Sequence, residues 1–234
     1  MPLNDPQLVE EQYASEANLL ARRALYEETT GPDPRELLWD AIVAAAPRRV
    51  LEVGGGPGEV SERMARELGA EVRYVDISPR MVALARARGV DAQVGDAQAL
   101  PFEDASFDTV VAAWMLYHVP DLDRGLGELA RVLEPGGRLV AATNSVDHLR
   151  ELRELISYPP GSELTFTAEN GEELLRRHFA QVERVDGPGT VTVRDRAKLV
   201  AYRESMSVET SPVPEDVGLP LVIRRASTVF VATR

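Results

Sequence analysis

The stretch VLEVGGGPG, residues 50–58, is an apolar run that ends in a cluster of glycines. Gly54, Gly56 and Gly58 lie between an expected strand and an expected helix. A loop of this composition lets the backbone approach a ligand closely, and it points the amide groups of a helix N-terminus toward the ligand's negative end. The stretch therefore predicts a strand–loop–helix unit with a ligand site at the loop.

Strands and helices alternate beyond this loop. Apolar strands that alternate with helices predict a parallel sheet covered on both faces. The run at 107–113 is mostly apolar, which is typical of a strand buried on both faces, and Ser78 followed by Pro79 is typical of a helix start. The expected strands are 49–53, 71–77, 91–94, 107–113 and 138–143, and the expected helices are 59–68, 79–88 and 122–133, the last capped by Asp121.

The two flanks of this region are less regular. On the amino side we expect helices at 6–28 and 34–46, separated by a break at 29–32. On the carboxyl side Gly, Pro and Ser clusters separate short pieces of helix and strand. The expected helices there are 146–156, 169–179 and 196–206, and the expected strands are 182–185, 190–193 and 228–232.

Composition and charge exclude several functional classes. The 234 residues carry 26 Lys and Arg against 38 Asp and Glu, a formal net charge of -12. Nucleic acids and anionic membranes would repel such a chain. Without cysteine there is no disulfide, thiolate zinc site or Cys nucleophile, and the histidine spacing suggests no metal site. No run is long enough to span a membrane, and residues 1–5 lack signal-peptide features, so we expect a cytoplasmic protein.

Acidic residues follow the next two strands. Asp76 stands 22 residues after Gly54, where a carboxylate can accept both hydroxyl groups of a ribose. Asp96 and Ala97 follow the third strand, where a carboxylate and a backbone amide can bind the amino edge of an adenine. The dinucleotide motif requires a further glycine at position 59, which is Glu59 here. Sites for an amino acid moiety, a ribose and an adenine, with no phosphate between them, describe S-adenosylmethionine.

Four stretches carry a resemblance to a known family: VLEVGGGPG, VRYVDISPRMV, VGDAQALPFEDASFDTVVAAWMLYHVPD and LARVLEPGGRLVAATN. In this order and spacing, over about residues 48–144, the sequence resembles a class I S-adenosylmethionine-dependent methyltransferase of the small UbiE-like (methyltransferase type 11) group. The resemblance implies a Rossmann-like α/β fold with seven strands in the order 3-2-1-4-5-7-6, strand 7 antiparallel. It also implies an N-terminal helical lid at 1–46 and a methyltransferase domain at 47–234. That domain has a cofactor-binding core at 48–144 and acceptor-shaping insertions within 145–225.

The resemblance also implies which residues bind the cofactor, with S-adenosylhomocysteine as the product. The loop and the acid before it would hold the methionine part, Asp76 the ribose, and a third group the adenine. Ala112 and Met115 would lie where the fourth strand passes the methionine part. The loop residues are Glu52, Gly54, Gly56 and Gly58, and the adenine residues are Ile77, Met81, Asp96 and Ala97.

One departure from related families bears on the acceptor. Methyltransferases that act on nucleic-acid bases carry Asn or Asp followed by two prolines and an aromatic residue after the fourth strand. Here that stretch, 112–115, reads AAWM. With an acidic chain as well, we expect a small-molecule acceptor, methylated on O, N or C, and neither nucleic-acid nor membrane binding.

Four aromatic residues are candidates for the acceptor side. His118, just after the fourth strand, has an ordinary pKa of about 6.5, which suits a general base near neutral pH; the alternative is a structural role. Trp114 and Tyr117 are candidates for the acceptor pocket or for core packing. Tyr13 belongs either to a lid over the site or to helix packing.

Two other functions stay open at this point. One is an NAD(P)-dependent oxidoreductase, against which Glu59 argues; the other is a non-catalytic S-adenosylmethionine-binding regulatory protein. A homodimer is possible. The charge excess lies in residues 1–46 and 101–144, which weakly favours a neutral or cationic acceptor over a phosphorylated one, although a solvated acidic helix face is the preferred explanation.

Overall fold

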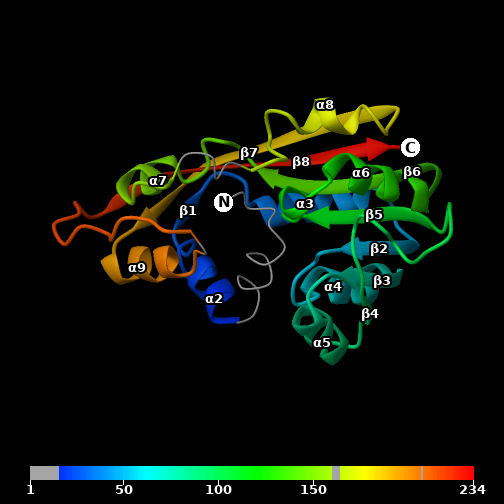
Figure 1. Ribbon diagram of the computed structural model, residues 1–234, viewed down its shortest axis with the longest axis horizontal. Coiled ribbons are helices and arrows are strands. Elements are labelled where there is room, and N and C mark those ends of the chain that lie inside the picture. Colours follow the sequence, from blue (N-terminus) through cyan, green and yellow to red (C-terminus); the bar gives the residue numbers. More distant parts are fainter. Residues whose placement is uncertain (1–15, 160–163, 207) are drawn as a thin grey trace.

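A computed structural model describes residues 16–159, 164–206 and 208–234, in which eight strands form one mixed sheet (Figure 1). The sheet order is β1-β7-β8-β6-β5-β2-β3-β4. The strands are β1 (Thr29–Thr30), β2 (Arg49–Val53), β3 (Glu71–Asp76), β4 (Asp91–Val94), β5 (Phe107–Ala113), β6 (Leu133–Asn144), β7 (Gln181–Val193) and β8 (Leu221–Thr233). The helices are α2 (Glu16–Ala24), α3 (Pro34–Ala44), α4 (Glu59–Leu68), α5 (Pro79–Ala87), α6 (Leu122–Val132), α7 (Arg150–Leu155), α8 (Gly171–Leu175) and α9 (Arg196–Glu204), with a 3-10 turn η1 (Leu116–His118).

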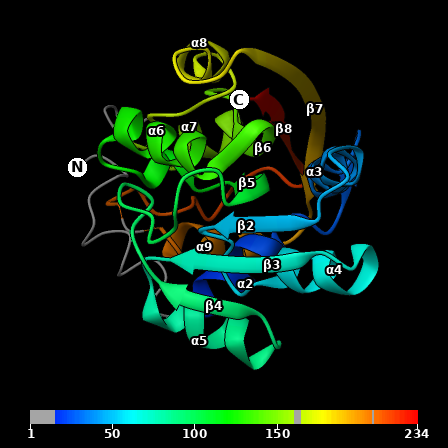
Figure 2. The same cartoon turned by 90° about the vertical axis from the view of Figure 1, so that its right-hand side faces the viewer.

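The parallel part of the sheet agrees with the sequence. β4, β3, β2, β5 and β6 pair in parallel, and Figure 2 shows β2 and β3 running side by side in one direction. β8 is inserted antiparallel between β6 and β7. The seven strands from β2 to β8 therefore have the predicted order, with the last strand antiparallel, and the α/β, Rossmann-like class is confirmed.

The sheet has an eighth strand, which the sequence did not predict. The expected break at 29–32 contains β1, which pairs antiparallel with β7 at the sheet edge. The Thr30 hydroxyl lies 2.8 Å from the Thr190 hydroxyl and accepts the Thr190 amide at 3.1 Å. Two residues are too short for a periodic pattern, so this strand depends on its partner and has no signal of its own in the sequence.

β7 differs from the prediction because it is continuous. The sequence suggested separate strand runs at 182–185 and 190–193, yet all thirteen residues of β7 pair with β8. A side chain at Gly189 would collide with the carbonyl oxygen of Thr30. The glycine therefore makes room for the crossing chain at β1, and it does not mark a turn.

Helices cover both faces of the parallel strands. On one face, α3 and α4 contribute Leu38, Ile42 and Met64 to a buried cluster that includes Val50 of β2. On the other face, α6 packs against β6 and α8 packs against β7 and β8, and both helices contribute to a larger cluster. α3 was expected within the N-terminal arm; its buried residues lie against the sheet, while α2 lies away from it (Figure 1).

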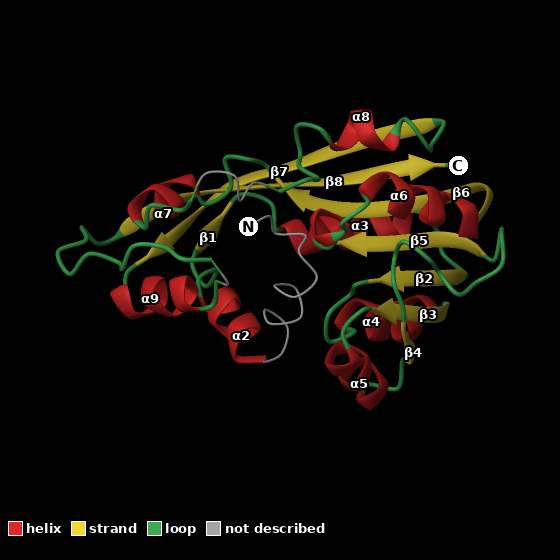
Figure 3. Cartoon of the chain, viewed as in Figure 1, coloured by secondary structure: helices red, strands yellow, loops and turns green. Residues whose placement is uncertain are grey.

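A second lobe forms around the far ends of β7 and β8. β6 ends at Asn144 opposite Ser227, and the long pair continues beyond it, as the yellow strands of Figure 3 show. Helices α2, α7 and α9 gather at these ends (Figure 1). They bury a separate apolar cluster with β7 and β8: Leu25, Leu149, Leu152, Ile156, Val191, Val193, Leu199, Val213 and Ile223.

Helices α7 and α8 are shorter than expected. The residue before α7, Leu149, has a left-handed backbone with φ of 56°. Residues 146–149 are turns, and the amides of Ser145 and Leu149 bind carbonyl oxygens of β8. Before α8, the side chain of Asn170 accepts the amide of Thr167 at 2.8 Å, which holds a turn there. Across the described parts of the chain, no helix combines the length and the apolar character that a bilayer span requires.

Candidate functional site

The glycine loop connects β2 to α4 at the carboxyl edge of the parallel strands. Gly54 donates its amide to the carbonyl of Val75 at 2.8 Å, which ties the loop to β3. Gly56 has a left-handed backbone with φ of 60°, and a Cβ built on it meets nothing within 4 Å. The loop therefore presents bare backbone to open space, as a ligand cradle requires.

Glu52 lies fully buried beneath this loop. Its Oε2 accepts a short hydrogen bond from the Ser61 hydroxyl, whereas Oε1 has no hydrogen-bond partner among the described residues. A side chain at Gly55 would run into this carboxyl group. Burial raises the pKa of Glu52 to about 7, against the opposing effect of the Ser61 hydrogen bond. A buried carboxyl oxygen without a donor fits the ammonium group of an amino acid moiety.

Asp76 ends β3 and faces the same loop. It is 8% exposed, and its carboxylate accepts the Ser78 amide at 2.8 Å and the Tyr74 hydroxyl at 2.9 Å. The Tyr74 hydroxyl also lies 2.6 Å from the Gly56 carbonyl oxygen. Burial raises the pKa of Asp76, while these hydrogen bonds oppose the shift. The ribose candidate and the loop thus belong to one hydrogen-bonded network.

The adenine candidates follow β3 and β4. Asp96 Oδ1 accepts the backbone amide of Gln98 at 2.8 Å, and the Gln98 side chain accepts the amide of Asp121 at 2.9 Å. Ile77 is 51% exposed and offers apolar surface, whereas Met81, at 1%, and Ala97, at 8%, are packed inside. Gln98, which links the third strand end to α6, was not among the residues that the sequence suggested.

The candidate residues at the end of β5 have different surroundings. Ala112 is fully buried in the strand, and the Met115 side chain lies against Gly54, because a Cβ there would approach it to 2.9 Å. Trp114 has a left-handed backbone, φ 53°, and packs in the cluster under α3, while its indole N–H donates to Asn144 at 3.2 Å. Trp114 is partly buried, and it is not among the residues that line the cavity described next.

A cavity of about 240 Å³ lies where the second lobe meets the ends of β5 and β6. Tyr117 and His118, on η1, line one part of it, and their rings meet edge to face at 4.6 Å. The remaining wall comes from the second lobe and the end of β6: Arg22, Tyr26, Asn144, Ser145, His148, Leu149, Arg153, Tyr158, Leu164, Tyr202, Met206 and Val208. His118 and Tyr117 thus face a cavity, and Tyr13 lies outside the described residues.

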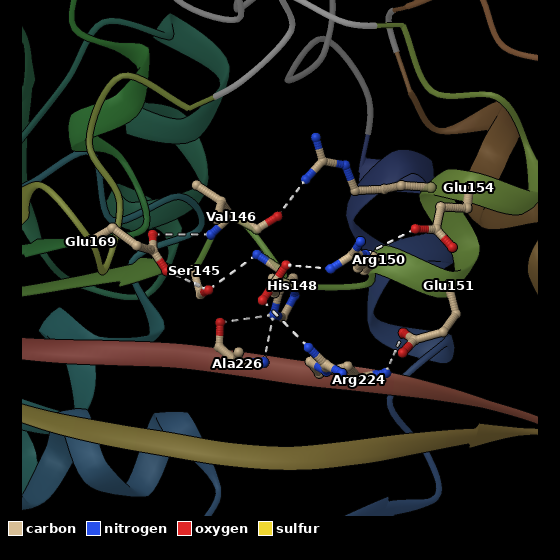
Figure 4. Close-up of polar contacts among 11 residues, drawn as sticks. Ser145, Val146, His148, Arg150, Glu151, Glu154, Glu169, Arg224 and Ala226 are labelled. Carbon is tan, nitrogen blue, oxygen red and sulfur yellow. Dashed lines mark hydrogen bonds and ion pairs between the residues drawn. The ribbon is translucent and has the colours of Figure 1, made fainter.

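His148 is a wall residue that was not among the site candidates from the sequence. Its Nε2 lies 2.9 Å from the Tyr26 hydroxyl, and its Nδ1 lies 3.1 Å from both the amide and the carbonyl oxygen of Ala226 (Figure 4). Burial lowers its pKa to about 4, with a smaller contribution from Arg225 and Arg153. Residues 26, 148 and 226 are far apart in the chain, so no local pattern identifies this contact.

Comparisons with known proteins point to methyltransferases. Residues 51–141 match the family described as "Methyltransferase domain". The chain is similar to a demethylmenaquinone methyltransferase of Thermus thermophilus, 43% identical over 108 residues, or 43% of this chain and 49% of the relative. It is also similar to an uncharacterized methyltransferase of Mycobacterium tuberculosis, 39% identical over 137 residues, or 56% of this chain and 55% of the relative. The chain thus matches about half the length of these relatives.

Solved structures share the fold over nearly the whole chain. The crystal structure of a [4+2]-cyclase, SpnF, has a TM-score of 0.64 at 24% identity and covers 97% of this chain and 95% of its own. A Thermotoga maritima structure, described as a S-adenosylmethionine-dependent methyltransferase and possible histamine N-methyltransferase, has a TM-score of 0.59 at 23% identity, with 97% and 96% covered. Residues 51–141 thus match a methyltransferase domain, and the fold is shared with solved structures described as S-adenosylmethionine-dependent methyltransferases.

Proposed function

We propose that the protein transfers the methyl group of S-adenosylmethionine to an O, N or C atom of a small-molecule acceptor bound in the cavity. The observation that carries this proposal is the pair formed by the open backbone at Gly56 and the buried, partly unpaired carboxyl group of Glu52 beneath it. The cavity is lined by Tyr117 and His118, which follow Met115 in the chain, and the Met115 side chain lies against Gly54 of the loop.

The cofactor residues suggested by the sequence are assigned on this basis. Glu52 and the loop glycines, Gly54, Gly56 and Gly58, would hold the methionine part, with Ala112 and Met115 beside it. Asp76 would accept the ribose hydroxyl groups. The adenine would lie on the exposed side chain of Ile77, with Asp96 and Ala97 at its edge; the buried Met81 would support that surface from beneath.

When bound, S-adenosylmethionine supplies a methyl group activated by a positively charged sulfur, so the chain needs no nucleophile of its own. The protein's contribution is to align the acceptor and to exclude water. His118 and Tyr117 line the cavity next to the strand end that carries Met115. We assign His118 as the base that removes a proton from the acceptor when the acceptor atom carries one.

Three other functions are compatible with such a fold. Glu59 continues to argue against a dinucleotide, because a carboxylate follows the loop where pyrophosphate would lie. A non-catalytic S-adenosylmethionine-binding protein would bind the cofactor without turnover. One structural neighbour is described as a [4+2]-cyclase, so the fold alone does not decide the reaction. Incubation with methyl-labelled cofactor and a panel of metabolites separates these functions from methyl transfer.

A pair of glycine variants tests the cofactor site directly. Gly56 and Gly69 have the same left-handed backbone, φ 60° and 65°, and a Cβ on either meets no other atom within 4 Å. Alanine at either position should therefore cost a similar backbone strain, about 1–2 kcal/mol. Gly69 caps the far end of α4, so Gly69→Ala is the matched control.

Calorimetry with S-adenosylhomocysteine measures the difference. We expect Gly56→Ala to weaken binding by roughly tenfold or more, because the new methyl group occupies the cradle, and Gly69→Ala to leave it unchanged. Equal affinity of the two variants for S-adenosylhomocysteine would contradict a cofactor site at the glycine loop. We also propose a cytoplasmic location, which cell fractionation tests. A lid role of residues 1–46 is tested by truncation of residues 1–15, and a homodimer by light scattering.

A further inference from the structure

Two arginines of the second lobe line the cavity. Arg22 comes from α2 and Arg153 from α7. Among the described residues that form this wall there is no aspartate or glutamate. A cavity with two permanent cations and no acid is unexpected in a chain with a net charge of -12.

Neutral groups hold both guanidinium groups in place. Arg22 donates to the carbonyl oxygen of Ser205 at 2.8 Å and to its hydroxyl at 3.3 Å. Arg153 donates to the carbonyl of Val146 at 2.9 Å, and its Cζ lies 4.8 Å from the centre of the Tyr158 ring. Within the described chain neither forms an ion pair. These contacts fix the positions of the cations, leave guanidinium N–H groups without an acidic partner and do not neutralise the charge.

The nearest acids on α7 point elsewhere. Glu154 accepts Arg150 at 2.9 Å, and Glu151 accepts the backbone amide of Arg224 at 2.7 Å (Figure 4). Asp147, just before α7, lies near Arg150 and Arg224, at 3.3 and 3.4 Å. These acids are bound to Arg150 and Arg224, so none of them forms an ion pair with Arg153.

A third cation reinforces the positive field. Arg225 of β8 is 3% exposed, and its Nη2 donates to the carbonyl oxygens of Thr30 and Pro32, each at 2.7 Å. Its Nε has no hydrogen-bond partner in the described chain. The charges of Arg225 and Arg153 both lower the pKa of His148, after the larger effect of burial. Their field therefore reaches the wall of the cavity.

Aromatic rings make up much of the remaining wall. Four of the six tyrosines in the chain, Tyr26, Tyr117, Tyr158 and Tyr202, line the cavity, together with His118 and His148. Flat rings with a polar edge favour a planar ligand, which they contact with their faces while their hydroxyl groups bind its substituents. The cavity, at about 240 Å³, is smaller than most drug-sized sites, which points to a compact molecule.

From these observations we infer that the methyl acceptor is a small aromatic molecule with a carboxylate, which Arg22 and Arg153 bind at the second-lobe end of the cavity. This inference rests on the proposed methyltransferase function. The carboxylate would leave the other end of the molecule toward Tyr117 and His118, beside the strand that passes the cofactor site. The arginines thus act as specificity residues, and they orient the acceptor atom toward the methyl group.

Three probes with one ring test the charge preference: 4-hydroxybenzoate, 4-hydroxybenzamide and 4-hydroxybenzylamine. Each is titrated into the protein saturated with S-adenosylhomocysteine. We expect the carboxylate to bind at least about tenfold more tightly than the amide, and the amine to bind more weakly than either. High salt should weaken the binding of the carboxylate and leave that of the amide unchanged. This salt test needs no variant.

Arginine variants then assign the preference to the cavity. Arg153→Gln should reduce carboxylate affinity by about tenfold, keep amide affinity within about twofold, and recover partly in Arg153→Lys. Arg150→Gln, which removes an exposed arginine of the same helix, is the matched control and should behave as the wild type. Thermal unfolding verifies that each variant is folded.

Several results would overturn the inference: equal binding of carboxylate and amide, tightest binding of the amine, an equal loss of both ligands in Arg153→Gln, or no binding of any probe. The proposed function fails separately, if S-adenosylhomocysteine itself does not bind. Binding of S-adenosylhomocysteine without a carboxylate preference refutes the acceptor class alone.

Discussion

Replacing Glu52 with glutamine removes a buried carboxyl group from beneath the glycine loop while keeping its shape. In the folded protein the pKa of Glu52 is about 7, because burial disfavours the charged form. In the unfolded chain it returns to the ordinary value of 4.5. The folded state therefore binds more protons between these two values, and the free energy of unfolding falls as the pH rises from about 4.5 to about 7.

The size of this effect follows from the shift. Each unit of pKa difference between the folded and unfolded states is worth about 1.36 kcal/mol. The shift of Glu52 therefore corresponds to about 3 kcal/mol of stability lost by pH 8. His148, with its pKa lowered to about 4, titrates in an overlapping range with the opposite sign. The two effects therefore partly cancel in the pH dependence of wild-type stability. The informative quantity is the free energy of unfolding of the variant minus that of the wild type.

Urea unfolding at about pH 4.5 and pH 8 measures that quantity. From pH 4.5 to pH 8, we expect the free energy of unfolding of Glu52→Gln to rise by about 3 kcal/mol relative to that of the wild type. This holds whatever the absolute stability of the variant at either pH. Glu62→Gln, on the partly exposed surface of α4 where Glu62 pairs with Arg88 at 2.9 Å, is the control. A difference between Glu52→Gln and the wild type that does not change with pH would refute the reasoning.

Two further substitutions test the assigned roles. Asp76→Ala should weaken S-adenosylhomocysteine binding by at least about tenfold, because it removes a charge-assisted contact worth about 1.5–3 kcal/mol; unchanged affinity in calorimetry would mean that the ribose lies elsewhere. His118→Ala should keep that affinity within about twofold and lower turnover on the order of a hundredfold in a methyl-transfer assay. Normal turnover of the variant would remove His118 from the mechanism.

The sequence predicted β2, β3, β4 and β5 to within one residue, whereas β6 begins at Leu133 and the strand expected there was 138–143. β4 and β5 have the expected bounds, and the side chain of Ser78 caps α5 by accepting the amide of Met81 at 3.4 Å. These elements are specified locally, by a buried apolar run or by a capping residue with proline after it. The strand order followed from resemblance to a family, and local patterns alone would not have given it.

The sequence did not show the second lobe or its cavity. The residues that meet there, such as Arg22, His148 and Tyr202, lie on elements separated by more than fifty positions in the chain. Each looks ordinary in its own segment, and the long β7–β8 pair brings them together. The cofactor-site residues could be predicted from the sequence because they follow successive strands that end at one edge of the sheet.

β7 and β8 run without interruption from one apolar cluster to the other, so the two halves of the molecule share a backbone and bury different side chains. Mutations that reshape the acceptor wall fall mainly between residues 144 and 208, away from the glycine loop at 54–58. Under the proposed function, such an architecture can change its acceptor while the donor site stays intact. Chimeras joined near Asn144 are the natural way to exchange acceptors between relatives.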